Sequence, residues 1–81
     1  IIKISEGLYT ADAKVELEVF LDFFEMNIDP MSIDAETLGG FIISSLGVLP
    51  KIGDEISLDN ITIIVSDADD RKINKVAVKV A

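Results

Sequence analysis

The stretch "DAETLGGFIISSLGVLPKIGDEI", residues 34–56, decides the fold of this chain, because it combines an apolar helical pattern with two adjacent glycines. Asp34 is a predicted N-cap, since its carboxylate can accept a hydrogen bond from a backbone N–H of the first helical turn. Gly47 is predicted to end the helix in the left-handed conformation, and Pro50 follows three residues later. The stretch therefore predicts one helix that begins at Asp34 and ends at Gly47.

The glycine pair, Gly39 and Gly40, lies inside this predicted helix, where each glycine costs about 1 kcal/mol relative to alanine. The lack of two Cβ atoms lets another backbone approach the helix closely, and we expect that contact to come from a strand or from the other helix. A phosphate-binding loop is the alternative, but such a loop needs its glycines where backbone N–H groups are free, before the helix. The pair lies five and six residues after the predicted start, which favours a packing contact.

The rest of the chain predicts one more helix and several strands. Residues 15–25 form the helix, with apolar side chains on one face at Val15, Val19, Phe20, Phe23 and Phe24. Residues 1–13 read as strand, turn and strand, and residues 55–58, 61–68 and 73–80 read as three further strands separated by turns. Apolar residues alternate with others in the last strand, which is typical of an antiparallel sheet. The predicted fold class is α+β, in the order β-β-α-α-β-β-β, with an antiparallel sheet of about five strands and two helices.

Length and charge restrict the classes of protein to which the chain can belong. A chain of 81 residues forms one domain, residues 1–81, and we expect it to be excised from a larger protein because it opens and closes on strands without an initiator Met. Fifteen acidic and seven basic residues give a net charge of −8, which argues against nucleic acid and against anionic membrane surfaces as partners. No apolar run is long enough for this domain to insert into a membrane.

The chain has no His and no Cys, so the usual nucleophile–base pairs are not available and we expect no enzymatic activity. The candidate metal ligands are Asp67, Asp69 and Asp70, whose carboxylates are the hard oxygen donors that magnesium and calcium prefer. The EF-hand pattern fails here, because Lys72 stands at the glycine position and Val78 at the glutamate position. The turn therefore predicts a weak, partly hydrated Mg or Ca site at most. The alternative is a solvated turn.

The segment "ETLGGFIISSLGVLPKIGDEI" resembles the signature of the transporter-associated domain at the C-terminus of CorC- and hemolysin-like proteins. The similarity covers nearly the whole chain, although Ala11-Asp12-Ala13 replaces a region where the family often has glycine. The 67–70 turn is a second departure. The structural signature residues that match are Thr37, Leu38, Gly39, Gly40, Leu46, Gly47, Pro50, Gly53 and Asp54.

The resemblance implies a C-terminal regulatory or interaction domain on the cytoplasmic side of the cell membrane. Its partners would be a CBS pair and a membrane domain of the same protein, which would export magnesium and cobalt or be hemolysin-like. The fold is also grouped with FAD-binding (PCMH-like) domains, although Tyr9 is the only residue that could supply a stacking tyrosine, and cofactor-binding residues are unknown. Two alternatives remain: a ligand-sensing domain for a divalent cation or an adenine nucleotide such as FAD, and a homodimerisation element.

Overall fold

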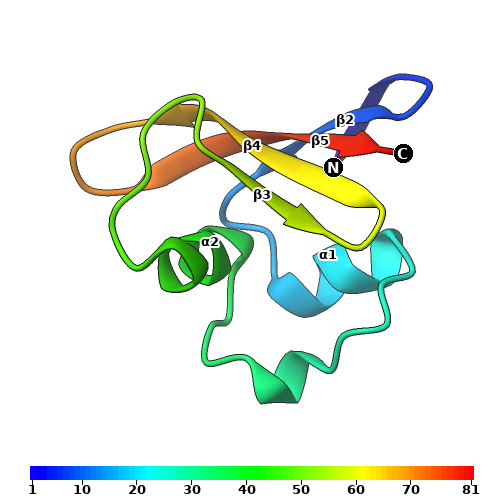
Figure 1. Ribbon diagram of the computed structural model, residues 1–81, viewed down its shortest axis with the longest axis horizontal. Helices are drawn as coiled ribbons and strands as arrows, with labels where there is room; N and C mark the ends of the chain where they lie inside the picture. The colour runs from blue at the N-terminus through cyan, green and yellow to red at the C-terminus, as the bar shows by residue number, and fades with distance from the viewer.

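The computed structural model describes residues 1–81, apart from the side chain of Pro30, and shows two layers, a sheet and the helices that cover it (Figure 1). The sheet has five strands in the order β1-β2-β5-β4-β3, and all neighbouring pairs are antiparallel. Among the described helices, none combines the length and apolar character required to cross a bilayer. The elements are β1 (Ile2–Ser5), β2 (Leu8–Asp12), α1 (Leu17–Phe23), the short 3-10 helix η1 (Pro30–Ser32), α2 (Leu38–Leu46), β3 (Glu55–Leu58), β4 (Ile61–Ala68) and β5 (Ile73–Val80).

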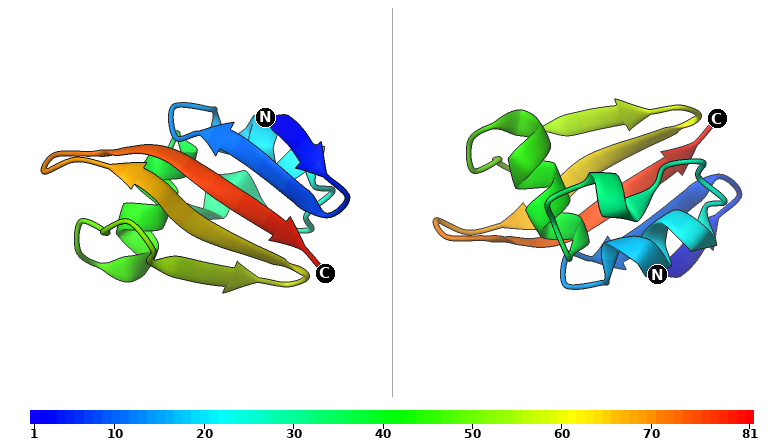
Figure 2. Two further views of the ribbon diagram at one scale, coloured as in Figure 1. Left: turned by 90° about the horizontal axis from the view of Figure 1, so that it is seen from above. Right: turned by 90° about the horizontal axis from the view of Figure 1, so that it is seen from below.

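The order of the strands and helices confirms the predicted α+β fold. Successive side chains of a strand point to opposite faces of the sheet, so one set on each strand faces the helices. On the central strands, Ile63 is paired with Val78 and Val65 with Val76, and all four side chains are buried. Figure 2 shows both helices lying across one face of the sheet, while the opposite face carries no covering element. The hydrophobic core therefore lies between the central strands and the helix layer.

Helix α1 is shorter than predicted, and the face it buries is different. It begins at Leu17 rather than at residue 15, and its buried side chains are Leu17, Phe20 and Leu21. Val19 and Phe23, which the sequence placed on the buried face, are 48% and 50% exposed. The i, i+3, i+4 row that starts at Leu17 faces the sheet, so the predicted row was wrong at these two positions.

Helix α2 begins later than predicted, and Asp34 is not its N-cap. The cap is Thr37, whose hydroxyl oxygen accepts a hydrogen bond of 3.1 Å from the N–H of Gly40. The start shifts because residues 15–17 and 36–38 pair as extended backbone, with the N–H of Leu38 donating to the carbonyl of Val15 at 3.0 Å. The predicted end is confirmed: Gly47 has φ +77° and donates its N–H to the carbonyl of Ile43.

The glycine pair makes the predicted close contact through Gly39. A Cβ at Gly39 would lie 3.2 Å from both the Cβ and the carbonyl oxygen of Ala13, in the segment that follows β2. The pair lies in the first turn of α2, so the positional argument against a phosphate loop was wrong. The N–H groups of Leu38, Gly39 and Gly40 nevertheless all donate, to Val15 O, Ala13 O and Thr37 Oγ1. None of these three N–H groups is therefore free to bind a phosphate.

Candidate functional site

The predicted metal turn is organised around one carboxylate, that of Asp69. Its Oδ1 accepts hydrogen bonds from the backbone N–H of Arg71 at 2.8 Å and of Lys72 at 2.9 Å. These two bonds, first that from Arg71, lower the pKa of Asp69 because they favour its charged form. Asp67 lies within β4, opposite Lys75. The Asp69 carboxylate therefore closes the β4–β5 turn.

The three aspartates of the predicted metal site are not gathered around one point. Within the part of the chain that the structure describes, no three carboxylates form a group that could hold a metal ion. The metal site at Asp67, Asp69 and Asp70 consequently stays a prediction that the geometry does not support.

The signature residues of the 47–54 loop hold the backbone between α2 and β3. Gly53 has φ +98° and donates its N–H to the carbonyl of Val65 at 2.8 Å. The carbonyl of Asp54 accepts the N–H of Val65 at 2.8 Å, while its carboxylate accepts the N–H of Lys51 at the same distance. Pro50 is buried. In this chain, these residues of the signature have structural roles.

Tyr9, the residue named for a stacking role with FAD, belongs to an aromatic cluster between β2 and α1. Its ring packs edge-to-face against Phe24 at 5.1 Å and against Phe23 at 5.7 Å, measured between centroids. Phe20 extends the cluster into the core, at 4.9 Å from Phe24. The cluster fixes α1 on β2, and this packing gives the flavin hypothesis no support.

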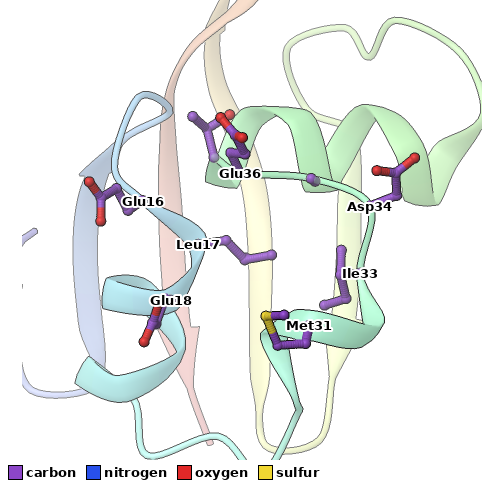
Figure 3. Close-up of a pocket in the computed structure, with 9 residues that line it drawn as sticks. Glu16, Leu17, Glu18, Met31, Ile33, Asp34 and Glu36 are labelled. Atoms are coloured by element: carbon purple, nitrogen blue, oxygen red, sulfur yellow. The ribbon is translucent and has the colours of Figure 1, made fainter.

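A groove of about 670 Å³ lies between the start of α1 and the segment that leads into α2. Figure 3 shows Leu17, Met31 and Ile33 around its central space, with the carboxylates at the periphery. Leu17 is buried, Ile33 is half-buried and Met31 is 90% exposed. The groove is lined by Glu16, Leu17, Glu18, Met31, Ile33, Asp34, Ala35, Glu36 and Thr37.

Four carboxylates, those of Glu16, Glu18, Asp34 and Glu36, line this groove and are all exposed. None of them forms an ion pair or a side-chain hydrogen bond with any residue that the structure describes. Sequence reasoning missed the groove because it assigned 34 and 36 to a helix. The available signal was a repeated triplet, Glu-Leu-Glu at 16–18 and Asp-Ala-Glu at 34–36, in which one apolar residue lies between two acids.

A second exposed surface lies where α2 ends. Leu46, Val48, Leu49 and Ile52 are 37%, 67%, 36% and 63% exposed. Leu49 and Ile52 also line a smaller groove of about 540 Å³ that is shared with Asp69 and Asp70 of the β4–β5 turn. These exposed apolar side chains form a candidate contact surface.

A family model and the curated relatives of this chain indicate the same protein family. The model of the CorC_HlyC family, described as Transporter associated domain, matches residues 2–81. Over 78 residues the chain is 34% identical to the Magnesium and cobalt efflux protein CorC of Buchnera aphidicola (subsp. Schizaphis graminum) and 31% identical to that of Escherichia coli K12, covering 96% of this chain in both cases. The chain spans 26% of the length of each of these two relatives.

Solved structures share the fold. A CorC-associated region from Neisseria meningitidis MC58 is 27% identical with a TM-score of 0.90, and the match covers 100% of this chain and 98% of that one. A domain from a Xylella fastidiosa Temecula1 hemolysin in complex with Mg++ and Mn++ is 20% identical with a TM-score of 0.82, covering 100% and 95%. These matches confirm the family predicted from the signature, and the chain belongs to the CorC_HlyC family of transporter associated domains.

Proposed function

We propose that this chain is a non-catalytic, C-terminal regulatory and interaction domain of a CorC-type protein that exports divalent cations such as magnesium and cobalt. The observation that carries the proposal is the 31–34% identity to Magnesium and cobalt efflux proteins over 96% of this chain. Since the chain spans about a quarter of those relatives, the partners would be the remaining domains of the same protein. By the family resemblance these are a CBS pair and a membrane domain, with this domain on the cytoplasmic side.

The surface of the domain supports an interaction role. Apolar side chains that the core does not use are exposed at Met31 and around the end of α2, at Val48 and Ile52. Each of these positions lies in or beside a groove, and exposed apolar groups next to a concave surface are typical of protein contacts. A domain that modulates transport must make such contacts with the parts of the protein that move ions.

A chimera tests the proposal. The segment of E. coli CorC that matches this chain is replaced by residues 1–81, and a second version lacks the segment altogether. We expect the deletion to change cobalt and magnesium efflux at unchanged membrane abundance, and the chimera to restore most of the efflux, since the family match extends over residues 2–81 of this chain. Equal efflux with and without the domain contradicts the proposal.

One observation favours a second candidate, a homodimerisation element. Strand β1 is a sheet edge with all four residues exposed, and Ile2 and Ile4 are 66% and 60% exposed. Unpaired edge strands with apolar side chains can pair with a second copy. A melting temperature that rises with protein concentration and loses this dependence in Ile4→Lys supports the dimer, while sedimentation as a monomer at every concentration contradicts it.

A further inference from the structure

We propose that the groove between α1 and residues 31–37 is a docking site for a cationic linear segment of protein that carries an apolar side chain between basic residues. The inference specifies one contact surface and rests on the interaction role proposed above. Three features of the groove support this occupant: the charge at its rim, its apolar floor and the backbone hydrogen bonds at one end.

The negative charge at the rim of the groove favours a partner with basic side chains. Glu16 and Glu18 line one wall and Asp34 and Glu36 the other, and no lysine or arginine lines the groove. All four carboxylates lie at the periphery of the same groove (Figure 3), so their negative potentials add there, and a basic partner gains attraction to both walls. The overall charge of −8 adds long-range attraction for the same partner.

The apolar floor of the groove favours a partner that has an apolar side chain as well as positive charge. Leu17 and Ile33 lie at the base, and Met31 is 90% exposed beside them. Methionine adapts its flexible, polarisable side chain to different apolar partners, which makes it common on binding surfaces. A bare metal ion would leave this apolar floor unused, and no three carboxylates among the described residues are close enough to share one.

One end of the groove, where residues 15–17 meet residues 36–38, is held by backbone hydrogen bonds before any partner binds. The N–H of Leu17 donates to the carbonyl of Glu36 at 2.9 Å, and the N–H of Leu38 donates to that of Val15 at 3.0 Å. These bonds join the start of α1 to the segment that enters α2. A groove with a fixed backbone loses little conformational entropy on binding, which favours capture of a short linear segment.

The test is a titration of the ¹⁵N-labelled chain with the peptide acetyl-Gly-Lys-Leu-Lys-Leu-Lys-Gly-amide, followed by amide chemical shifts. We expect saturable shift changes at residues 16–18 and 31–37, which weaken as salt is added because the rim charges are exposed. Shift changes that map to other residues, or no saturable change, overturn the proposal.

Matched variants separate the groove from the net charge. The groove variant is Glu16→Gln, Glu18→Gln, Asp34→Asn and Glu36→Gln. The control variant removes the same number of negative charges from exposed positions on the strands and turns: Glu55→Gln, Asp59→Asn, Asp67→Asn and Asp70→Asn. We expect the groove variant to bind the peptide at least about tenfold more weakly than the wild type and the control at most about twofold more weakly. Equal loss in the two variants means attraction by net charge alone and overturns the proposal.

Met31→Ser tests the apolar part of the site, because it keeps all four carboxylates and removes the exposed thioether. We expect it to weaken binding of the peptide several-fold, and to have no effect on a peptide in which Ser replaces both Leu residues. Unchanged binding of the Leu-containing peptide contradicts the apolar contact. Because this binding test involves no transport, it can fail while the efflux test succeeds, and the reverse.

Discussion

The β4–β5 turn and the groove beside α1 are both acidic, but their carboxylates have different surroundings. In the turn, Asp69 accepts two backbone hydrogen bonds, from residues two and three positions later in the chain. In the groove, Glu16 and Glu36 come from segments distant in sequence, and neither side chain has a partner among the described residues. Adjacent acids therefore serve local turn formation, while acids brought together by the fold remain available to a ligand.

The largest loss of stability among the groove and turn variants is expected at Gly39, which packs against Ala13 in the segment after β2. Gly39→Leu should destabilise the domain by about 3 kcal/mol, because a Cβ there already lies 3.2 Å from the backbone and Cβ of Ala13. Urea unfolding of the chain measures the change. Gly40→Leu is the matched control and should lose less stability, since the neighbours of a Cβ at Gly40 are the side chains of Thr37 and Ala35 and no backbone atom. Equal losses of stability in the two variants would contradict a specific close contact between Gly39 and Ala13.

A smaller effect is expected at the cap that joins the groove to α2. Thr37→Ala should destabilise the domain by about 1 kcal/mol, because the N–H of Gly40 loses its acceptor. Thr37→Ser keeps the hydroxyl and should retain most of the stability in the same unfolding assay. If the two variants lose the same stability, the methyl group rather than the cap is responsible.

The β4–β5 turn predicts a pH dependence of stability. The pKa of Asp69 is lowered below its ordinary value of 3.8, so its stabilising contribution is present above that pH and is lost as pH falls through the lowered pKa. Asp69→Ala should therefore lower the melting temperature at neutral pH. The difference in melting temperature between the variant and the wild type should become smaller as the pH is lowered. The control is Asp70→Ala, because the Asp70 carboxylate accepts no backbone hydrogen bond in the described turn, and it should lower the melting temperature at neutral pH less than Asp69→Ala.

Met31 should have almost no effect on folding. Since its side chain is 90% exposed, Met31→Ser should change the free energy of unfolding by less than about 0.5 kcal/mol. Phe20→Ser, at a fully buried position, is the contrasting variant and should unfold the domain far more easily. A large loss at Met31 would mean that it packs in the core and does not form part of a binding surface.

No effect is expected from metal titration of the turn. Magnesium, calcium and cobalt should not raise the melting temperature beyond the effect of ionic strength, because Asp69 is engaged by backbone N–H groups and no three described carboxylates are gathered. A saturable rise that disappears when Asp67, Asp69 and Asp70 are all changed to Asn would confirm the sequence-based metal site instead.

Much of the fold could be predicted because its signals are local. Alternation placed the strands at residues 61–68 and 73–80, where β4 and β5 lie, and Gly47 ended α2 as expected. Residue type and spacing carry these features, since a period of two or a left-handed glycine is recognisable within a few residues. The family signature at 36–56 is local in the same way.

The helix starts and the groove could not be predicted, because both depend on one long-range contact. Asp34 satisfies every local rule for an N-cap, yet α2 begins after Thr37 because the backbone around it pairs with residues 15–17. The same pairing keeps residue 16 extended, so α1 begins at Leu17, later than predicted. Local propensity is a weak preference that such tertiary hydrogen bonds override.

The sequence alone determined the fold class and the strand positions, because side-chain periodicity and turn residues act within short stretches. The resemblance of residues 36–56 to the family signature indicated the family. The tertiary structure decided which acids meet. It joined Glu16 and Glu18 to Asp34 and Glu36 across the groove, and it directed the Asp69 carboxylate to the backbone of its own turn. The physical reason is that the position of a charge along the chain says nothing of its spatial neighbours until the backbone hydrogen bonds between distant segments have formed.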